Sequence, residues 1–148
     1  MESVKWISDL FEEHERLYHL CLFYKLKEEK IHYGQIPVLL ALAERDGCNQ
    51  CALATALNVS RASIGVSLRR MEKVGLVRRE TCREDARYNT VYITDEGKRI
   101  LEKAKEVLEY TFRGTLEGVT PDELEAFRNI MEKMNRNISA MRDELKKK

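Results

Sequence analysis

Two short segments with helical spacing, separated by a tight turn, constrain the fold of this 148-residue chain most strongly. Asn49 and Ser60 favour helix N-caps, and Gly75 favours a helix end. Apolar residues with helical spacing follow each cap: Leu53, Ala54 and Leu57 in the first segment, and Ile64, Leu68 and Met71 in the second. The turn at Asn58-Val59 between them completes the pattern of a helix-turn-helix.

A β-hairpin is predicted directly after this unit, from strands at Leu76–Thr81 and Thr90–Thr94. Val91 and Ile93 alternate with polar neighbours, as in a strand with one buried face. The charged residues 82–89 separate the two strands. A hairpin in this place is a wing, so we expect a mainly α fold with a small β-wing, a winged helix-turn-helix.

Two helices are expected before this unit. The first covers residues 4–28, and the second opens at Gly34, accommodates Pro37 in its first turn and ends at Asp46-Gly47. The first helix carries a wide apolar stripe with aromatic members: Ile7, Leu10, Phe11, His14, Leu17, Tyr18, Cys21 and Tyr24.

Two further helices are expected after the wing. Thr94 caps a long one that breaks between Gly114 and Gly118, and Thr120 and Glu123 form a capping box for the last. The apolar residues of the last helix keep a strict heptad spacing: Leu124, Phe127, Met131, Met134, Ile138, Met141 and Leu145. We infer that the first and last helices bury their apolar faces in a homodimer. Packing of the two termini within one chain is an alternative that is compatible with dimerisation.

The composition favours a helical protein of the cytoplasm. A chain that is 43% apolar is not disordered, and only two prolines and seven glycines interrupt it. No apolar run approaches the ~18 residues that a membrane span needs, and the N-terminus is too charged for a signal peptide. We therefore expect a cytoplasmic protein without membrane contact.

Positive charge gathers in the middle of the chain, although the net charge is only +1. Residues 60–79 contain six basic side chains and one acid, whereas residues 1–35 contain five basic side chains and seven acids. This asymmetry is expected when one face meets phosphate, although a solvated helix face gives the same pattern.

Several motifs occur in a fixed order across about residues 31–97: Gln35-x-x-Val38-Leu39-x-x-Leu42, Leu53-Ala54-x-x-Leu57-x-Val59-Ser60, Ser63-Ile64, Met71-Glu72-Lys73-x-Gly75-Leu76-Val77-x-Arg79, Asp85-Ala86-Arg87 and Val91-x-Ile93-Thr94-x-x-Gly97. In this order and spacing the sequence resembles the MarR family of bacterial and archaeal regulators. The resemblance implies a sequence-specific DNA-binding transcriptional regulator, expected to be a repressor that acts as a homodimer on a palindromic operator. It also implies a small effector that releases the operator. We expect a single domain (1–148), with a winged-helix DNA-binding lobe (31–97) and dimerisation helices (1–30 and 98–148).

The sequence departs from the family pattern at two positions. Gly65 stands where Ser or Thr is usual, and a glycine inside a helix costs ~1 kcal/mol relative to alanine. Either the backbone approaches something closely there, such as DNA, or the glycine reflects drift. Ala52 replaces an acidic residue, which removes one arm of a capping box at the third helix.

The helix that begins after Ser60 is the expected recognition helix. The residues predicted to face DNA are Ser60, Arg61, Ala62, Ser63, Val66, Ser67, Arg69 and Arg70. Arg61 suits a bidentate contact to guanine, and Ala62 or Val66 suits a thymine methyl group. Arg69, Arg70 and Lys73 can hold phosphates or can be ordinary surface charges.

Three wing residues are further candidates. The resemblance implies that Arg87 enters the minor groove. Asp85 lies two residues before Arg87, a spacing that lets its carboxylate orient the guanidinium, and Arg83 is expected near a phosphate. The alternative for this pair is an isolated surface ion pair, which contributes little.

Candidates for a regulatory site are weaker. The resemblance implies an effector pocket to which His14, Tyr18 and Tyr24 contribute, although packing in the core or the dimer interface explains them equally well. Cys48 and Cys51 have the spacing of a redox pair, and Cys51 would lie in a first helical turn, where thiol pKa values fall. Reduced, structural thiols remain the favoured interpretation. Without a second pair of ligands we predict neither a metal site nor a cofactor.

Two alternatives to the effector-controlled repressor stay open. One is a thiol- or metal-responsive sensor on the same fold, switched through Cys48 and Cys51. The other is a winged-helix module that binds proteins and not DNA, against which the retained Arg61, Asp85 and Arg87 argue. No phosphate-binding loop, histidine-rich metal motif or activated nucleophile is present, so we do not expect an enzyme.

Overall fold

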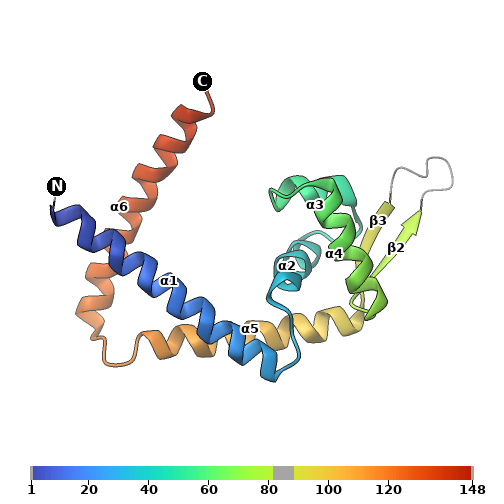
Figure 1. The fold of residues 1–148 in the computed structure, drawn as a ribbon, viewed down its shortest axis with the longest axis horizontal. Helices are drawn as coiled ribbons and strands as arrows, with labels where there is room; N and C mark the ends of the chain where they lie inside the picture. The colour runs from blue at the N-terminus through green and yellow to red at the C-terminus, as the bar shows by residue number, and fades with distance from the viewer. Residues whose placement is uncertain (1, 82–88, 148) are drawn as a thin grey trace. The chain divides into compact units, whose positions relative to one another are not determined.

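The computed structural model describes residues 2–81 and 89–147. The chain is mainly helical with one small antiparallel sheet, which confirms the predicted fold class (Figure 1). Its elements are, in chain order, α1 (Glu2–Glu28), the 3₁₀ helix η1 (Tyr33–Gln35), α2 (Ile36–Glu44), β1 (Cys48–Asn49), α3 (Gln50–Ala56), α4 (Arg61–Lys73), β2 (Val77–Thr81), β3 (Asn89–Ile93), α5 (Asp95–Thr115) and α6 (Pro121–Leu145). No single helix in the described ranges is long and apolar enough to span a bilayer, although α3 and α4 pass that test together as a bent pair.

The chain divides into two compact units, Met1–Phe112 and Arg113–Lys148. The first unit contains α1 to α4, the sheet and most of α5. The second contains the end of α5 and all of α6. The two units are described separately below.

Helices α3 and α4 form the predicted helix-turn-helix. The chain bends by 113° between them, within the range of this motif. Helix α3 ends in a Schellman motif, in which Asn58 is left-handed (φ 52°) and the N–H of Val59 donates to the carbonyl of Ala54 (3.0 Å). Ser60 then caps α4 by accepting the N–H of Ser63 (3.0 Å). Local capping therefore defines both sides of the turn.

The sheet has three strands in the order β1-β3-β2, one more than the sequence predicts. Strands β2 and β3 form the wing hairpin, in which Val77 pairs with Ile93. Strand β1 adds Cys48 opposite Val91 on the other side of β3. The Asp46 carboxylate extends this edge by accepting the N–H of Ile93 (2.9 Å). A strand of two residues leaves no alternating pattern, so the sequence does not show it.

The second helix starts later than predicted. Residues Tyr33–Gln35 form a 3₁₀ turn, and α2 begins at Ile36 and not at Gly34. Pro37 occupies the second position of α2, where a missing N–H removes no intrahelical hydrogen bond. The proline therefore sets the helix start.

Two apolar clusters form the core of the first unit. The larger cluster joins the helix-turn-helix to the sheet: Val38, Leu39, Leu42, Cys48, Leu53, Ala54, Ile64, Leu68, Met71, Leu76, Val77, Val91, Ile93 and Leu101. The smaller cluster joins the end of α1 to α2 and α5: Leu22, Leu26, Ile31, Ile36 and Ala104. The apolar residues that predict α3 and α4 therefore belong to the core, apart from Leu57, which is partly buried against it.

Most of the apolar stripe of α1 is exposed within the chain. Ile7 is 39% exposed and Tyr24 is 57% exposed, and of the eight stripe residues only Tyr18 is half-buried. Leu22 and Leu26, which lie outside the predicted stripe, make the buried contacts of α1. Helix α1 therefore has two apolar faces, and the chain covers one of them.

The second unit begins its long helix with the predicted capping box. The N–H of Thr120 donates to the Glu123 carboxylate (2.8 Å), and Thr120 Oγ1 accepts the N–H of Glu123 (3.4 Å). Along α6 the heptad side chains stay exposed, from 36% at Leu124 to 68% at Leu145, except that Met131 is half-buried. The seam of α6 is therefore available for another helix.

Candidate nucleic-acid interface

The outward face of α4 carries the residues expected to contact DNA. The inward face is buried: Ile64, Gly65, Leu68 and Met71. The exposed side chains are Arg61, Ala62, Ser63, Val66, Arg69 and Arg70. Ser67 is half-buried, with its hydroxyl 3.8 Å from the sulfur of Met71. Helix α4 thus presents a mixed stripe of arginine, alanine and valine to solvent.

Hydroxyl groups fix the first turn of α4. Besides the cap, the Oγ atoms of Ser60 and Ser63 lie 2.8 Å apart, so each hydroxyl has a partner inside the turn. This turn carries Arg61 and Ala62, and the N-terminal half of a recognition helix is the part that reaches base edges. The two serines therefore hold the segment that is best placed for contacts with bases.

The six basic residues of the middle segment fall into two groups. Arg78 bonds Glu80 and lies over the ring of Tyr92, 4.0 Å from its centroid. Arg79 bonds Glu72, and this hydrogen bond holds the pKa of the Glu72 carboxyl below its usual range. Within residues 2–81 and 89–147, no ion pair engages the other four: Arg61, Arg69, Arg70 and Lys73. Within this segment, the positive charge that has no ion-pair partner therefore lies on α4.

The side chain of Gln50, in α3, lies close to Gly65. A glycine in the middle of a helix suggests such a close approach of another group to the backbone. A Cβ atom at this position would be 3.0 Å from Nε2 of Gln50 and 3.8 Å from a terminal nitrogen of Arg69. The amide of Gln50 thus rests against α4 where a side chain would otherwise stand. A Cβ at position 65 would therefore require a small shift of the Gln50 side chain.

The three wing candidates, Arg83, Asp85 and Arg87, lie outside the described residues. The strands that lead to and from them are described, and the ladder between β2 and β3 continues to the pair Thr81↔Asn89.

The start of α5 is attached to the turn that ends α4. The N–H of Thr94 donates to the Leu76 carbonyl (3.1 Å), and the Thr94 hydroxyl donates to the Gly75 carbonyl (2.6 Å). The same hydroxyl oxygen accepts the N–H of Gly97 (3.0 Å), which confirms Thr94 as the N-cap. At Gly97 a Cβ would overlap the Leu76 carbonyl and lie 2.8 Å from Ile93 Cγ1. Only a glycine permits this approach of α5 to the end of α4.

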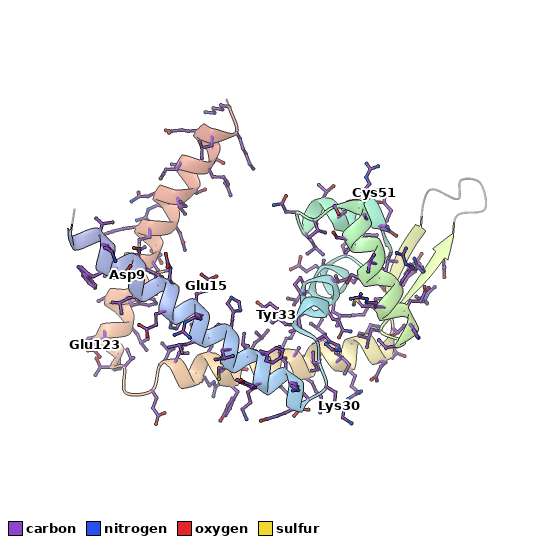
Figure 2. All side chains as sticks on the ribbon, in the orientation of Figure 1. Asp9, Glu15, Lys30, Tyr33, Cys51 and Glu123 are labelled. Carbon is purple, nitrogen blue, oxygen red and sulfur yellow. The ribbon has the colours of Figure 1, made fainter. Side chains whose placement is uncertain are left out.

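Two of the three proposed effector residues come together. The rings of His14 and Tyr18 stack with centroids 6.0 Å apart. His19 extends the group to Tyr33, and the centroids of these two rings lie 5.5 Å apart. Tyr33 follows α1 in η1 (labelled in Figure 2). The pKa of Tyr18 is raised, mainly by burial. Tyr24 lies apart, and its ring contacts Phe23 (5.7 Å). Sequence reasoning missed His19 and Tyr33, because their contact joins separate elements and leaves no local spacing.

The two candidate redox cysteines have different surroundings. Cys48 is buried in β1, and burial raises the pKa of its thiol, which disfavours the reactive thiolate. Cys51 is half-buried in the first turn of α3 (Figure 2). Among the residues that the structure describes, no group of three or more His, Cys, Asp or Glu side chains is arranged to hold a metal ion.

Comparisons with known proteins agree with this geometry. A family model described as MarR family matches residues 31–87. Transcriptional regulator HosA of Escherichia coli O111:H- is 37% identical over 103 residues, 68% of this chain and 74% of that protein. The YusO protein from Bacillus subtilis has 17% identity and a TM-score of 0.79, over 91% of this chain and 96% of that one. A MepR variant of S. aureus bound to an oligodeoxyribonucleotide has 22% identity and a TM-score of 0.64, over 89% and 97%.

The helix-turn-helix, its basic outward face and the hairpin after it define a winged-helix protein of the DNA-binding class. The chain belongs to the MarR family. It is a MarR-family transcriptional regulator, and members of this family are regulators and not enzymes.

Proposed function

We propose that this protein is a homodimeric repressor that binds a palindromic operator through α4 and the wing and is released by a small effector. The observation that carries the proposal is the free positive charge of α4. Arg61, Arg69 and Arg70 are exposed, and no described side chain pairs with them. The MepR variant that shares the fold is bound to an oligodeoxyribonucleotide, which supports the same use of the fold here.

Different residues of α4 contact the bases and the phosphates of the operator. Arg61, in the first turn, donates two hydrogen bonds to a guanine in the major groove. Ala62 and Val66 lie one turn apart on the exposed face and contact thymine methyl groups. Arg69 and Arg70 lie further along the helix and neutralise phosphates, which fixes the position of α4 on the duplex.

The wing provides a second contact. Arg87 enters the minor groove, where narrow A·T tracts concentrate negative potential, and Asp85 orients its guanidinium. Arg83 approaches a phosphate. Because Arg78 and Arg79 are engaged in ion pairs, these wing residues and α4 supply the contacts to DNA.

Dimerisation uses the apolar faces that the chain leaves uncovered. On α1, Leu10, Phe11 and Leu17 are between 42% and 55% exposed, and α6 exposes most of its heptad seam. Exposed apolar surface on this scale marks an interface. A two-fold dimer places two recognition helices on one duplex, so the operator is an inverted repeat with half-site centres ~10 base pairs, or a multiple of that, apart. Because the target is chromosomal DNA, the proposed compartment is the cytoplasm.

The effector site is proposed at the aromatic group of His14 and Tyr18, extended by His19 and Tyr33. This group borders the smaller core cluster, which joins α1 to α2 and α5. The dimer can hold its two recognition helices at a spacing that fits the operator or at one that does not. A ligand that binds one of these two conformations more tightly shifts the equilibrium between them and so changes the affinity for the operator.

The proposal is tested by selection from random-sequence duplexes with the wild type, Arg87→Ala and Arg99→Ala, all at one salt concentration. Arg99 is a matched control, because this exposed arginine of α5 is paired with Glu96. We expect the wild type and the control to enrich a palindrome and Arg87→Ala to enrich it more weakly. If a folded dimer enriches nothing, even under reducing conditions, the repressor proposal fails and the protein-interaction module becomes the leading account.

A further inference from the structure

Glu72 and Arg79 connect the recognition helix directly to the wing. Glu72 lies in the last turn of α4, and Arg79 lies in the middle of β2. The backbone N–H of Arg79 donates to Glu72 Oε1 (3.2 Å), and its side-chain Nε donates to Oε2 (2.9 Å). The terminal Nη2 of Arg79 also donates to Oε2. One carboxylate therefore holds both the backbone and the side chain of a wing strand.

The pair is less exposed than the Arg78–Glu80 ion pair of the same strand. The Arg79 side chain is 22% exposed and that of Glu72 is 37% exposed, whereas Arg78 and Glu80 are 54% and 57% exposed. Side chains alternate between the faces of a strand. Arg79 therefore lies on the face of β2 turned toward α4, and Arg78 and Glu80 lie on the opposite face. Arg79 is engaged by Glu72 and is not available to a phosphate.

The bonds close a short segment that contains the left-handed glycine at the end of α4. Gly75 (φ 77°) ends α4, and four residues separate Glu72 from Val77, the first residue of β2. The hydrogen bonds of Thr94 attach α5 to this turn and do not attach the body of β2. Among the described residues, the Glu72 bonds are the hydrogen bonds that join an α4 side chain to the wing strands. Together with the larger apolar cluster, which includes Met71, Val77 and Val91, they restrict how the hairpin can tilt against α4.

We propose that Glu72 and Arg79 are positioning residues for DNA binding. They do not touch DNA. They fix the orientation of the wing relative to α4, so that the major-groove and minor-groove contacts can form on the same duplex at the same time. The inference rests on the proposed function, in which both elements contact the operator.

A double-mutant cycle tests this inference on the full-length protein and the duplex selected by the wild type, at one salt concentration. Arg87→Ala is measured in three backgrounds: wild type, Glu72→Gln and Glu80→Gln. Glu80→Gln is the matched control, because it removes the same charge from an ion pair that lies within β2 and does not reach α4. Thermal unfolding of each variant shows whether it is folded.

We expect Arg87→Ala to lower affinity about tenfold or more in the wild type and the Glu80→Gln background. In the Glu72→Gln background the same change should lower it less than about threefold, because a misplaced wing contributes little before Arg87 is removed. If Glu72 only stabilises the fold, Arg87→Ala should lower affinity by the same factor in all three backgrounds. That result would overturn the inference. An Arg87→Ala change without effect in the wild type would also overturn it.

Charge reversal gives an independent readout. Glu72→Arg alone should lower affinity, and adding Arg79→Glu should restore part of it, because the side-chain pair forms again with opposite polarity. A double variant no better than Glu72→Arg contradicts the positioning role. If the wild type selects no duplex, the proposed function fails; if it binds and the cycle is additive, only this inference fails.

Discussion

Gly97→Ala is the substitution whose effect the structure determines most directly. A Cβ at position 97 would overlap the carbonyl oxygen of Leu76 and lie 2.8 Å from Ile93 Cγ1 and 3.2 Å from the Leu76 carbonyl carbon. The carbonyl belongs to the backbone and accepts the N–H of Thr94 (3.1 Å), so it cannot turn away without breaking that bond. The substitution must therefore separate the start of α5 from the end of α4.

The magnitude follows from three terms. Overpacking a closed core site costs about 1–3 kcal/mol, and loss of the Thr94 hydrogen bond adds about 1 kcal/mol. The higher helix propensity of alanine relative to glycine offsets up to about 1 kcal/mol of this loss. The free energy of unfolding should therefore fall by about 1–3 kcal/mol.

Urea unfolding at one fixed protein concentration measures this change, because the stability of the proposed dimer depends on protein concentration. Gly114→Ala is the matched control: it lies in the same helix and has open space where the Cβ would be, so it should not destabilise. Operator affinity should fall with Gly97→Ala and not with Gly114→Ala. A Gly97→Ala protein as stable as the wild type would refute the proposed tight contact between α5 and α4.

Three further substitutions test the local account. Lys30→Gly should raise the free energy of unfolding by up to ~1 kcal/mol, because Lys30 ends α1 in a left-handed conformation (φ 59°) that favours glycine. A lower free energy of unfolding in urea would contradict this. Ser60→Ala should lower it by ~1 kcal/mol through loss of the α4 cap, and an unchanged urea midpoint would argue against the cap. The pKa of Glu72 is lowered in the folded state, so the ionised carboxylate adds to the free energy of unfolding. This stabilisation is fully present above the unfolded-state pKa and is lost as pH falls through the folded-state pKa. Wild type should therefore lose more stability than Glu72→Gln in thermal unfolding on acidification, and parallel pH profiles would exclude the Glu72 contribution.

Much of the fold is predictable because its signals are local. The caps at Asn49, Ser60, Thr94 and Thr120 are each defined within three or four residues, and the structure forms all four. The buried face of α4 follows from helical spacing in the same way. Local signals therefore place the recognition helix and define its exposed face.

The remaining features depend on contacts between distant residues. Strand β1 forms because β3 is available to pair with it, and the close neighbour of Gly65 is Gln50 of another helix. The sequence counts Arg79 among the six basic residues of 60–79, but the chain reversal at Gly75 brings it to Glu72. Such partners are separated along the chain and leave no periodic signal.

Selection from random duplexes with Arg61→Ala beside the wild type tests the central claim most directly. The account predicts that both proteins enrich related inverted repeats, and that Arg61→Ala loses its preference for guanine at one symmetric pair of positions. Arg70→Ala should weaken binding to all sequences and reduce the slope of log affinity against log salt by about 1. An Arg61→Ala protein that enriches the same repeat with the same preference at every position would contradict recognition of DNA bases by the first turn of α4.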